Sequence, residues 1–419
     1  MNINPTTHKH ALAFIIVVVL LDAIGFGIIL PVTPQLIIDL AGVDLSNASQ
    51  LGGYLMFAYA LMQFFAAPIL GNLGDRFGRR PIILYSLIVL AIGYAMMAFA
   101  PTLLWLFAAR MVAGAASSTF SLAYAYITDI TPEEKRAQRF GMVGAAFGGG
   151  FILGPVIGGL LGEYGARLPF IVAAILAALN VVYGYLVLGE SLSEENRRPF
   201  EIRRANPMGA LLALRKYPLV SGLALAYFLY MLGHLSLPST WTYYTMEKFA
   251  WSEWQVGLSL GYAGVFMIIV QAFLIRWAIP NLGAFKAGLI GLLTMTIGFI
   301  GYALSTESWQ LYVWLALAAL SGFVSPAFQS IMTSQVPANA QGELQGALSS
   351  LNSVTSIIGP LLMTKLFSTY TSVDASYYLP GAPFLAAALL TLASLILFVP
   401  LVRHFGLTTL GRRAAPALS

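Results

Sequence analysis

Long apolar runs, broken by short polar segments, fill almost the whole chain. A helix that crosses a bilayer needs about 20 mostly apolar residues, and runs of that length recur twelve times. The predicted spans cover residues 11–31, 50–71, 81–100, 104–126, 141–162, 168–188, 219–239, 255–275, 284–304, 309–332, 344–367 and 382–402. The pattern therefore predicts an all-α membrane protein with 12 transmembrane helices.

Composition narrows the class of protein further. Apolar residues make up 58% of the 419 residues and charged residues only 9%, whereas an ordinary soluble domain holds about 25% charged residues. A soluble enzyme, a disordered chain and a nucleic-acid-binding protein are excluded. With no cysteine and four scattered histidines, the chain offers no Cys or His metal site, and we expect no cofactor. It also lacks the phosphate-binding loop of ATP-driven pumps and the HExxH pattern, so we expect no enzyme.

Basic residues gather in alternate loops. If both termini are cytoplasmic, 18 of the 22 Lys and Arg residues fall in cytoplasmic segments, in agreement with the positive-inside rule. The longest polar stretch, residues 190–217, follows the sixth span and is predicted to be a cytoplasmic linker. It separates a predicted N-terminal six-helix bundle (1–189) from a C-terminal six-helix bundle (218–419).

The two halves carry related patterns. In the first half, Gly141 is followed by a Gly-Pro pair at 154–155. In the second half, Gly346 is followed at the same interval by a Gly-Pro pair at 359–360, and both elements are shifted by 205 residues. Two parallel six-span repeats are the arrangement of the major facilitator fold.

The loop between spans two and three reads GNLGDRFGRRP, residues 71–81. Its glycines suit a tight turn, Asp75 can form an ion pair with an arginine, and Asp129 after span four can bridge to the same basic cluster. The string resembles the loop 2–3 signature of the major facilitator superfamily. A latch that holds one conformation is one interpretation, and a charged turn that only fixes topology is the other. The predicted latch residues are Gly71, Asp75, Arg76, Gly78, Arg79 and Arg80.

Span five contains a run of small residues, GMVGAAFGGGFILGPVIGG. Small residues let membrane helices pack backbone to backbone, and Pro155 removes one backbone donor and favours a kink. The spacing resembles the span-five motif of proton-coupled antiporters in that superfamily. A hinge or sealed contact between the halves is one interpretation, and tight packing alone is the other. The predicted hinge residues are Gly141, Gly150, Gly154, Pro155, Gly158 and Gly159.

Three longer segments resemble the tetracycline-resistance branch of the drug:proton antiporters. They are LLDAIGFGIILPVTPQL (20–36), FAYALMQFFAAPILGNLGDRFGRRP (57–81) and LQGALSSLNSVTSIIGPLL (344–362). The resemblance implies a major facilitator fold of two six-helix bundles in a bacterial inner membrane. It also implies proton-coupled efflux of tetracycline or a related antibiotic by alternating access. The expected protein is a monomer whose partners are a small-molecule drug, protons and the bilayer, with Mg²⁺ only as part of a chelated substrate.

Asp22 and Arg110 lie inside predicted spans. An ionisable residue there is costly and usually marks an ion or substrate path. The resemblance implies that Asp22 carries the proton and meets a cationic substrate, and that Arg110 adjusts it directly or through water. A structural acid at Asp22 and an arginine that reaches the outer surface are the alternatives.

Polar and aromatic side chains in the spans suit an amphipathic drug, although each is also explained by a helix-packing hydrogen bond. Together with Asp22, the predicted substrate-binding residues are Gln63, Tyr124, His234, Trp241, Gln271, Gln329, Asn352 and Ser356.

The chain departs from the tetracycline branch at two places. Tetracycline pumps carry further acids in spans three and nine, where this sequence has Gly93 and Met295. Broader multidrug efflux and proton-coupled transport of a small metabolite therefore remain alternatives. A receptor that transports nothing is a third alternative, and the intramembrane Asp22 and Arg110 argue against it.

Overall fold

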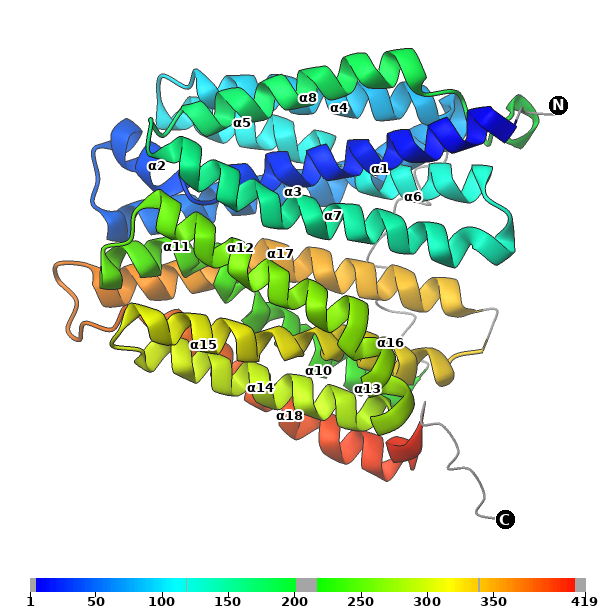
Figure 1. The fold of residues 1–419 in the computed structure, drawn as a ribbon. Coiled ribbons are helices and arrows are strands. Elements are labelled where there is room, and N and C mark those ends of the chain that lie inside the picture. Colours follow the sequence, from blue (N-terminus) through cyan, green and yellow to red (C-terminus); the bar gives the residue numbers. More distant parts are fainter. Residues whose placement is uncertain (1–4, 118, 201–216, 338–339, 411–419) are drawn as a thin grey trace. The chain divides into compact units, whose positions relative to one another are not determined.

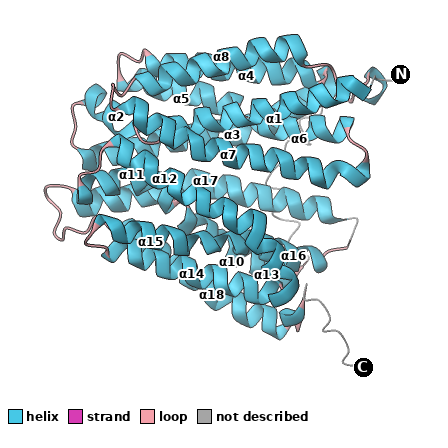
Figure 2. Cartoon of the chain, in the orientation of Figure 1, coloured by secondary structure: helices cyan, strands magenta, loops and turns pink. Residues whose placement is uncertain are grey.

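The computed structural model describes residues 5–117, 119–200, 217–337 and 340–410, and throughout these ranges the regular elements are helices (Figures 1 and 2). Among the described residues, 11 helices are long and apolar enough to cross a membrane, or 12 if one bent pair counts as a single span. The predicted all-α membrane fold is confirmed.

Two compact units make up the chain. The first comprises Met1–Asn206 and Ala250–Gly261, and the second comprises Pro207–Phe249 and Tyr262–Ser419. The division into 1–189, 190–217 and 218–419 stays a prediction, and linker residues 201–216 lie outside the described residues.

The first unit is built from the helices of the N-terminal half and the start of one later helix. They are α1 (Pro5–Ile28), α2 (Thr33–Ala41), α3 (Leu45–Phe77), α4 (Arg79–Ala98), α5 (Leu103–Ala116), α6 (Thr119–Ile130), α7 (Glu133–Gly162), α8 (Leu168–Val187), the 3₁₀ turn η1 (Glu194–Asn196) and the beginning of α12 (Glu253–Ile269). The bent pair is α1 and α2, which meet at an angle of 49°.

Within this unit, α1 packs against α7 and α8, while α5 packs against α3 and α4 (Figure 1). Phe14, Val18, Leu87, Tyr126 and Val143 form part of a shared apolar core. Other large apolar side chains face outward, among them Leu186, which is 74% exposed on α8. An apolar outer surface is costly in water and favourable in lipid.

The second unit follows the same helical plan with more interruptions. Its elements are α10 (Pro218–His234), α11 (Ser236–Phe249), the remainder of α12, the π-helix η4 (Val270–Leu274), α13 (Ile275–Leu282), α14 (Ala284–Leu304), α15 (Ser308–Ala318), the 3₁₀ helix η5 (Ala319–Phe323), α16 (Val324–Ser334), α17 (Gln341–Thr371), α18 (Ala382–His404) and the 3₁₀ turn η7 (Leu407–Thr409).

Several predicted spans are broken where the sequence pattern predicts one continuous helix. Proline explains two of the breaks, because its ring nitrogen cannot donate to the carbonyl four residues earlier. Pro238 follows the break between α10 and α11, and Pro326 follows the 3₁₀ helix η5. Span eight changes to the wider π-helix at Val270.

Some helices also extend beyond the apolar runs. The second span, predicted over 50–71, is the 33-residue helix α3. Its start is fixed by Asp44, whose side chain accepts a hydrogen bond from the backbone N–H of Asn47 at 3.0 Å. Such a cap satisfies one of the free N–H groups at a helix start, so α3 starts among polar residues.

Candidate transport site

Arg110 is buried in the first unit, with 6% of its surface exposed. Its guanidinium carbon lies 5.6 Å from the centroid of the Tyr59 ring, so α5 and α3 meet in a cation–π contact. This arrangement stabilises a desolvated cation. Arg110 therefore points into the helix bundle and does not reach an outer surface.

Two tyrosines lie near both Arg110 and Asp22. Tyr59 and Tyr94 both lie within electrostatic range of both charged groups. One turn after Asp22, Gly25 leaves room for Tyr94, since a Cβ at Gly25 would lie 3.2 Å from the phenol oxygen. Helices α1, α3, α4 and α5 thus gather a carboxyl, two phenols and a guanidinium. Such a set can hold a proton and exchange it.

Gln63 extends this site by one turn along α3. Its Nε2 lies 3.4 Å from the carbonyl oxygen of Ser117, and Tyr59 forms a side-chain hydrogen bond with the same serine. Tyr124 lies elsewhere, with its ring 5.0 Å from that of Phe140 against the core of α6 and α7. Tyr59 and Tyr94 were not selected from the sequence, although Tyr59 stands four residues before Gln63 and therefore on the same helix face.

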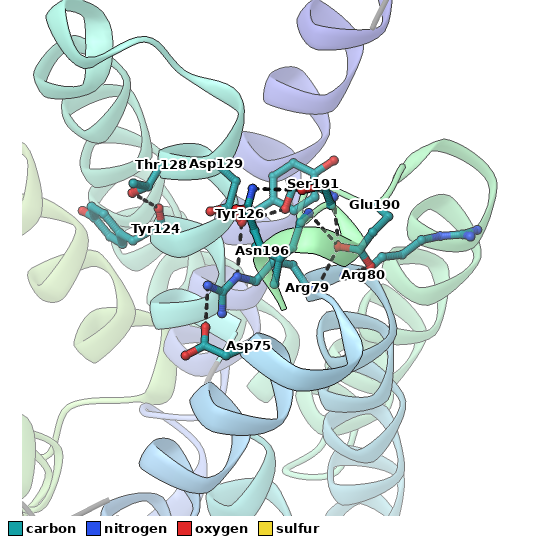
Figure 3. Close-up of polar contacts among 12 residues, drawn as sticks. Asp75, Arg79, Arg80, Tyr124, Tyr126, Thr128, Asp129, Glu190, Ser191 and Asn196 are labelled. Atoms are coloured by element: carbon teal, nitrogen blue, oxygen red, sulfur yellow. Dashed lines mark hydrogen bonds and ion pairs between the residues drawn. The ribbon is translucent and has the colours of Figure 1, made fainter. Parts of the chain in front are cut away.

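An ion-pair network occupies the turn between α3 and α4 (Figure 3). Gly78 forms the turn at a φ of 104°, which side chains disfavour. Arg79 starts α4, and its guanidinium lies 2.6 Å from Asp75 Oδ1 and 3.2 Å from Asp129 Oδ2. The predicted ion pair of Asp75 and the predicted bridge to Asp129 are confirmed. These partners all belong to the first unit, and the latch role stays a prediction.

Glu190 completes the network just after α8. Its carboxylate accepts hydrogen bonds from the backbone N–H groups of Arg79 at 2.8 Å and Arg80 at 3.3 Å. It also accepts from Ser191 and Leu192, at 2.9 and 3.0 Å. A carboxylate is favoured at a helix start, where free N–H groups and the helix dipole point at it. The sequence signal for this role is the acid that directly follows span six.

The other predicted latch residues differ in their surroundings. Arg80 lies 5.8 Å from the ring centroid of Tyr185 and donates to that residue's carbonyl at 3.0 Å. Arg76 is exposed, and a Cβ at Gly71 would meet nothing within 4 Å. Gly71 and Arg76 therefore lie outside the network.

One face of α7 consists of glycines that touch α1. A Cβ at Gly150 would lie 2.5 Å from the carbonyl oxygen of Leu20, and one at Gly154 would lie 2.7 Å from that of Ile24. Gly158, four residues further on, faces α1 in the same way. Because the neighbours are backbone atoms, no larger residue fits without moving a helix.

Pro155 and Gly159 face the start of α12, within the same unit. A Cβ at Gly257 would collide with the carbonyl of Pro155, and one at Gly159 would collide with the carbonyl of Glu253. Gly141 has open space around it. The structure thus shows close packing at every predicted hinge residue except Gly141, and the hinge role stays a prediction.

In the second unit, the predicted substrate residues separate into two groups. His234 and Gln271 line a cavity of about 220 Å³. Trp241 is only 1% exposed and lies in an aromatic core, with its ring 5.2 Å from Tyr302 and 6.1 Å from Phe384.

The remaining candidates lie on α16 and α17. Gln329 is exposed on α16. On α17, the Ser356 hydroxyl donates to the backbone carbonyl of Asn352 at 2.8 Å, and Asn352 Oδ1 is buried with no hydrogen-bond partner among the described residues.

The two positions that depart from the tetracycline branch are tightly packed. A Cβ at Gly93 would lie 3.1 Å from that of Ala113, and Met295 is only 2% exposed. Both positions are buried among packed helices in this structure. Across the described residues, no three His, Cys, Asp or Glu side chains come together as a metal site.

Comparison with known proteins defines the class. Residues 15–360 and 286–417 match the family model of the Major Facilitator Superfamily, and the chain belongs to this superfamily. It is a multi-pass membrane transporter and no enzyme. The human organic anion transporter MFSD10 shares the fold, with a TM-score of 0.71 and 24% identity over 94% of this chain and 100% of that one. The nucleoside transporter NupG does so with a TM-score of 0.76 and 13% identity over 94% and 99%.

Within the superfamily, the chain is similar to the tetracycline resistance proteins. It is 39% identical to the class C protein of Escherichia coli, over 90% of this chain and 96% of that protein. The class H protein of Pasteurella multocida is 35% identical over 91% and 96%, and the class B protein of Escherichia coli is 34% identical over 84% and 87%. The predicted resemblance to this branch is confirmed.

Proposed function

We propose that the chain exports tetracycline or a related antibiotic in exchange for protons. The observation that carries this proposal is the 39% identity with a tetracycline resistance protein across 90% of the chain. The cluster of Asp22, Arg110, Tyr59 and Tyr94 supports the proton coupling, because it supplies an acid and a cation inside the spans. The protein would act as a monomer in a bacterial inner membrane, with both termini cytoplasmic.

Coupling needs only that the proton and the drug favour different protonation states of one site. Asp22 is neutral with its proton bound and anionic without it, so a cationic or strongly dipolar drug binds the anionic state better. Arg110 opposes the charge of the ionised carboxylate and favours release of the proton. The hydroxyls of Tyr59 and Tyr94 can donate to the carboxylate in its ionised state.

Two rocking six-helix bundles would carry the site between the membrane faces. The Asp75–Arg79–Asp129 network is the proposed latch, and the small residues of α7 are the proposed hinge. An ion pair that is more stable in one conformation than in the other shifts the conformational equilibrium toward the first. The size of the shift is the difference between the free energies of the pair in the two conformations.

Gly93 and Met295 favour a second candidate, a multidrug exporter. Without acids in the third and ninth spans, the site has fewer charges for a metal chelate, and uncharged or monocationic drugs become suitable. Mg²⁺ would enter only as part of a chelated substrate and would use no protein ligand set of its own.

A susceptibility panel tests the proposal. The chain would be expressed in a pump-deficient bacterial host and compared with the empty host on tetracyclines, phenicols, quinolones and cationic dyes. We expect resistance to tetracyclines that disappears when a protonophore collapses the gradient. Resistance confined to other compounds would favour the multidrug exporter, and resistance that survives the protonophore would contradict proton coupling.

A further inference from the structure

Helices α4 and α8 pack against each other in the first unit (Figure 1), and each exposes apolar side chains. Each helix has 20 residues, the length that crosses the hydrocarbon core of a bilayer. The exposed side chains recur every three or four residues and therefore share one face of their helix. They are Tyr85, Ile88 and Ile92 on α4, and Leu179, Val182 and Leu186 on α8. These six residues form the α4–α8 face, which suits the acyl chains of lipids.

Arg80 lies at one end of the α4–α8 face. It is the second residue of α4, and its guanidinium carbon lies 5.8 Å from the ring centroid of Tyr185, near the end of α8. Because both helices are as long as the hydrocarbon core is thick, Arg80 and Tyr185 lie at its boundary, next to the lipid headgroups. Basic side chains and tyrosines are both favoured at this depth.

The guanidinium of Arg80 has one nitrogen left for a partner outside the protein. Nη2 donates to the backbone carbonyl of Tyr185 at 3.0 Å. Nη1 has no hydrogen-bond partner among the described residues and, unlike Nε, is not buried. The side chain extends away from Asp75 and Asp129 (Figure 3), and no described carboxylate forms an ion pair with it. Arg80 therefore presents a positive charge at the edge of an apolar surface.

Arg167, at the opposite end of the same helix pair, provides a comparison. Its Nη1 donates to the carbonyl of Ala98 at 3.2 Å, and its Nη2 donates to the carbonyl of Ala100 at 2.9 Å. Both terminal nitrogens of Arg167 thus have partners at the end of α4, whereas Nη1 of Arg80 does not. A guanidinium beside exposed apolar side chains attracts an anion that itself carries acyl chains.

We propose that Arg80 and Tyr185 bind the headgroup of an anionic phospholipid whose acyl chains lie along the α4–α8 face. Nη1 of Arg80 donates to a phosphate oxygen in a charge-assisted hydrogen bond. The Tyr185 ring and carbonyl hold the guanidinium in place. A headgroup with a net negative charge is favoured over a zwitterionic one, because the site offers a cation without a paired acid. This site is separate from the exported drug and does not rest on the proposed function.

Local quenching by labelled lipids tests the site. The chain has no cysteine, so Leu186→Cys gives the full chain a single attachment point for a fluorophore, next to Tyr185. The labelled protein is placed in phosphatidylcholine nanodiscs that contain a small fraction of nitroxide-bearing phosphatidylglycerol or nitroxide-bearing phosphatidylcholine. The ratio of the two quenching efficiencies measures the local preference for the anionic lipid. We expect a ratio of about five, which is the contribution of one basic residue at a membrane surface.

Substitutions at the two ends of the helix pair identify the residue responsible. We expect Arg80→Gln to lower the ratio to about one, and Arg80→Lys, which keeps the charge, to retain most of it. Arg167→Gln is the matched control and should leave the ratio unchanged, because both terminal nitrogens of Arg167 are paired within the protein. Tyr185→Leu keeps the backbone carbonyl and removes the ring, so we expect a ratio of about two to three.

A second label position separates a local site from a general effect of charge. Leu104, exposed on α5, is changed to cysteine in an otherwise wild-type chain, and the same ratio is measured with and without Arg80→Gln. We expect no change at Leu104. A ratio near one at the Leu186 position, or a ratio there that Arg80→Gln leaves unchanged, overturns the site. An equal fall at both positions overturns it too, because the total charge of the protein would then explain the preference. Melting temperatures show that each variant is folded, and Tyr185→Leu remains a test if Arg80→Gln is not.

Discussion

The turns that follow the second span of each half share a backbone conformation and differ in charge. Gly78 has φ 104° and ψ 158°, and Gly283, 205 residues later, has φ 84° and ψ 160°. Each glycine ends one helix and begins the next. In the first half Arg79 follows, within its ion-pair network, whereas Ala284 follows in the second half.

The acceptor for the first N–H of the next helix differs in the same way. Glu190 supplies a carboxylate to Arg79, and Leu410 supplies a backbone carbonyl to Ala284 at 3.0 Å. Both acceptors come from the segment after the sixth span of their half. The turn thus requires a glycine with a positive φ and an acceptor for the first N–H of the next helix. It does not require charged side chains. The charges of the first turn are therefore available for the proposed latch.

The largest expected effect comes from a charged residue inside a span of the first half whose counterpart in the second half is uncharged. Residue 227, 205 positions after Asp22, is a tyrosine that pairs with Ser325 at 3.2 Å. Asp22→Asn removes the group that can exchange a proton, so we expect uphill drug transport to fall by at least about 100-fold. Tyr227→Phe removes one hydrogen bond, and we expect transport to stay within about threefold. Drug uptake into everted vesicles driven by a pH gradient measures both. Uphill transport by Asp22→Asn would refute the assignment.

The glycines beside the two repeated prolines give the next largest effect. Gly154 faces backbone atoms of α1, whereas Gly359 faces the side chain of Leu235, with a Cβ 2.6 Å from its Cδ1. The Cδ1 of Leu235 can turn away, whereas its Cβ, at 2.9 Å, needs a small backbone shift, so the clash at Gly359 is relieved in part and the backbone clash at Gly154 is not. We expect Gly154→Ala to lower the free energy of unfolding by about 2–3 kcal/mol and Gly359→Ala by about 1 kcal/mol. Thermal unfolding in detergent compares them.

Gly148→Ala is the control for these glycine variants, because a Cβ there would meet nothing within 4 Å. Equal losses for Gly154→Ala and Gly359→Ala would contradict the packing argument. Loss of transport by Gly154→Ala without loss of stability would support a hinge at this position.

Glu190 gives a smaller effect on stability. Its carboxylate accepts two N–H bonds from α4 and two from its own turn, but it is exposed to solvent. We expect Glu190→Ala to lower the free energy of unfolding by about 1–2 kcal/mol, in the range for loss of a helix cap. Glu194→Ala is the matched control, since that side chain is 89% exposed and its contact with Arg197 is 3.8 Å long. Equal melting temperatures for the two variants would contradict the stabilising role of Glu190 at the start of α4.

The apolar periodicity predicted the spans because length and hydropathy are what a bilayer requires. It did not predict the helix breaks, since the π-helix at Val270 contains no proline or glycine and depends on what packs beside it. Asp22 and Arg110 were found as charges in apolar runs. The sequence did not predict that Tyr59 and Tyr94 belong to the site or that Trp241 is buried in a core. An aromatic residue in a span gives the same sequence pattern whether it faces a site or a core.

The smallest expected effect concerns a pair in the second unit that carries a single negative charge. The Tyr378 hydroxyl donates to Glu247 Oε1 at 2.8 Å. Partial burial, with the hydrogen bond to Glu247 and the negative charge of Glu247, raises the pKa of Tyr378 to about 12. An unfolded tyrosine has a pKa of about 10, so the contact stabilises the fold fully below pH ~10 and is lost as the pH rises through about 12.

Because Tyr378 is 58% exposed, solvent screens the contact, and we expect Tyr378→Phe to change the free energy of unfolding by only a few tenths of a kcal/mol. Thermal unfolding should show this difference near pH 8 and a smaller one near pH 11, with Tyr377→Phe as a neighbouring exposed control. A difference that grows with pH would mean that the phenolate, and not the phenol, is the stabilised form. The hydrogen bond to Glu247 forbids that, since an ionised phenol has no proton to donate and repels the carboxylate.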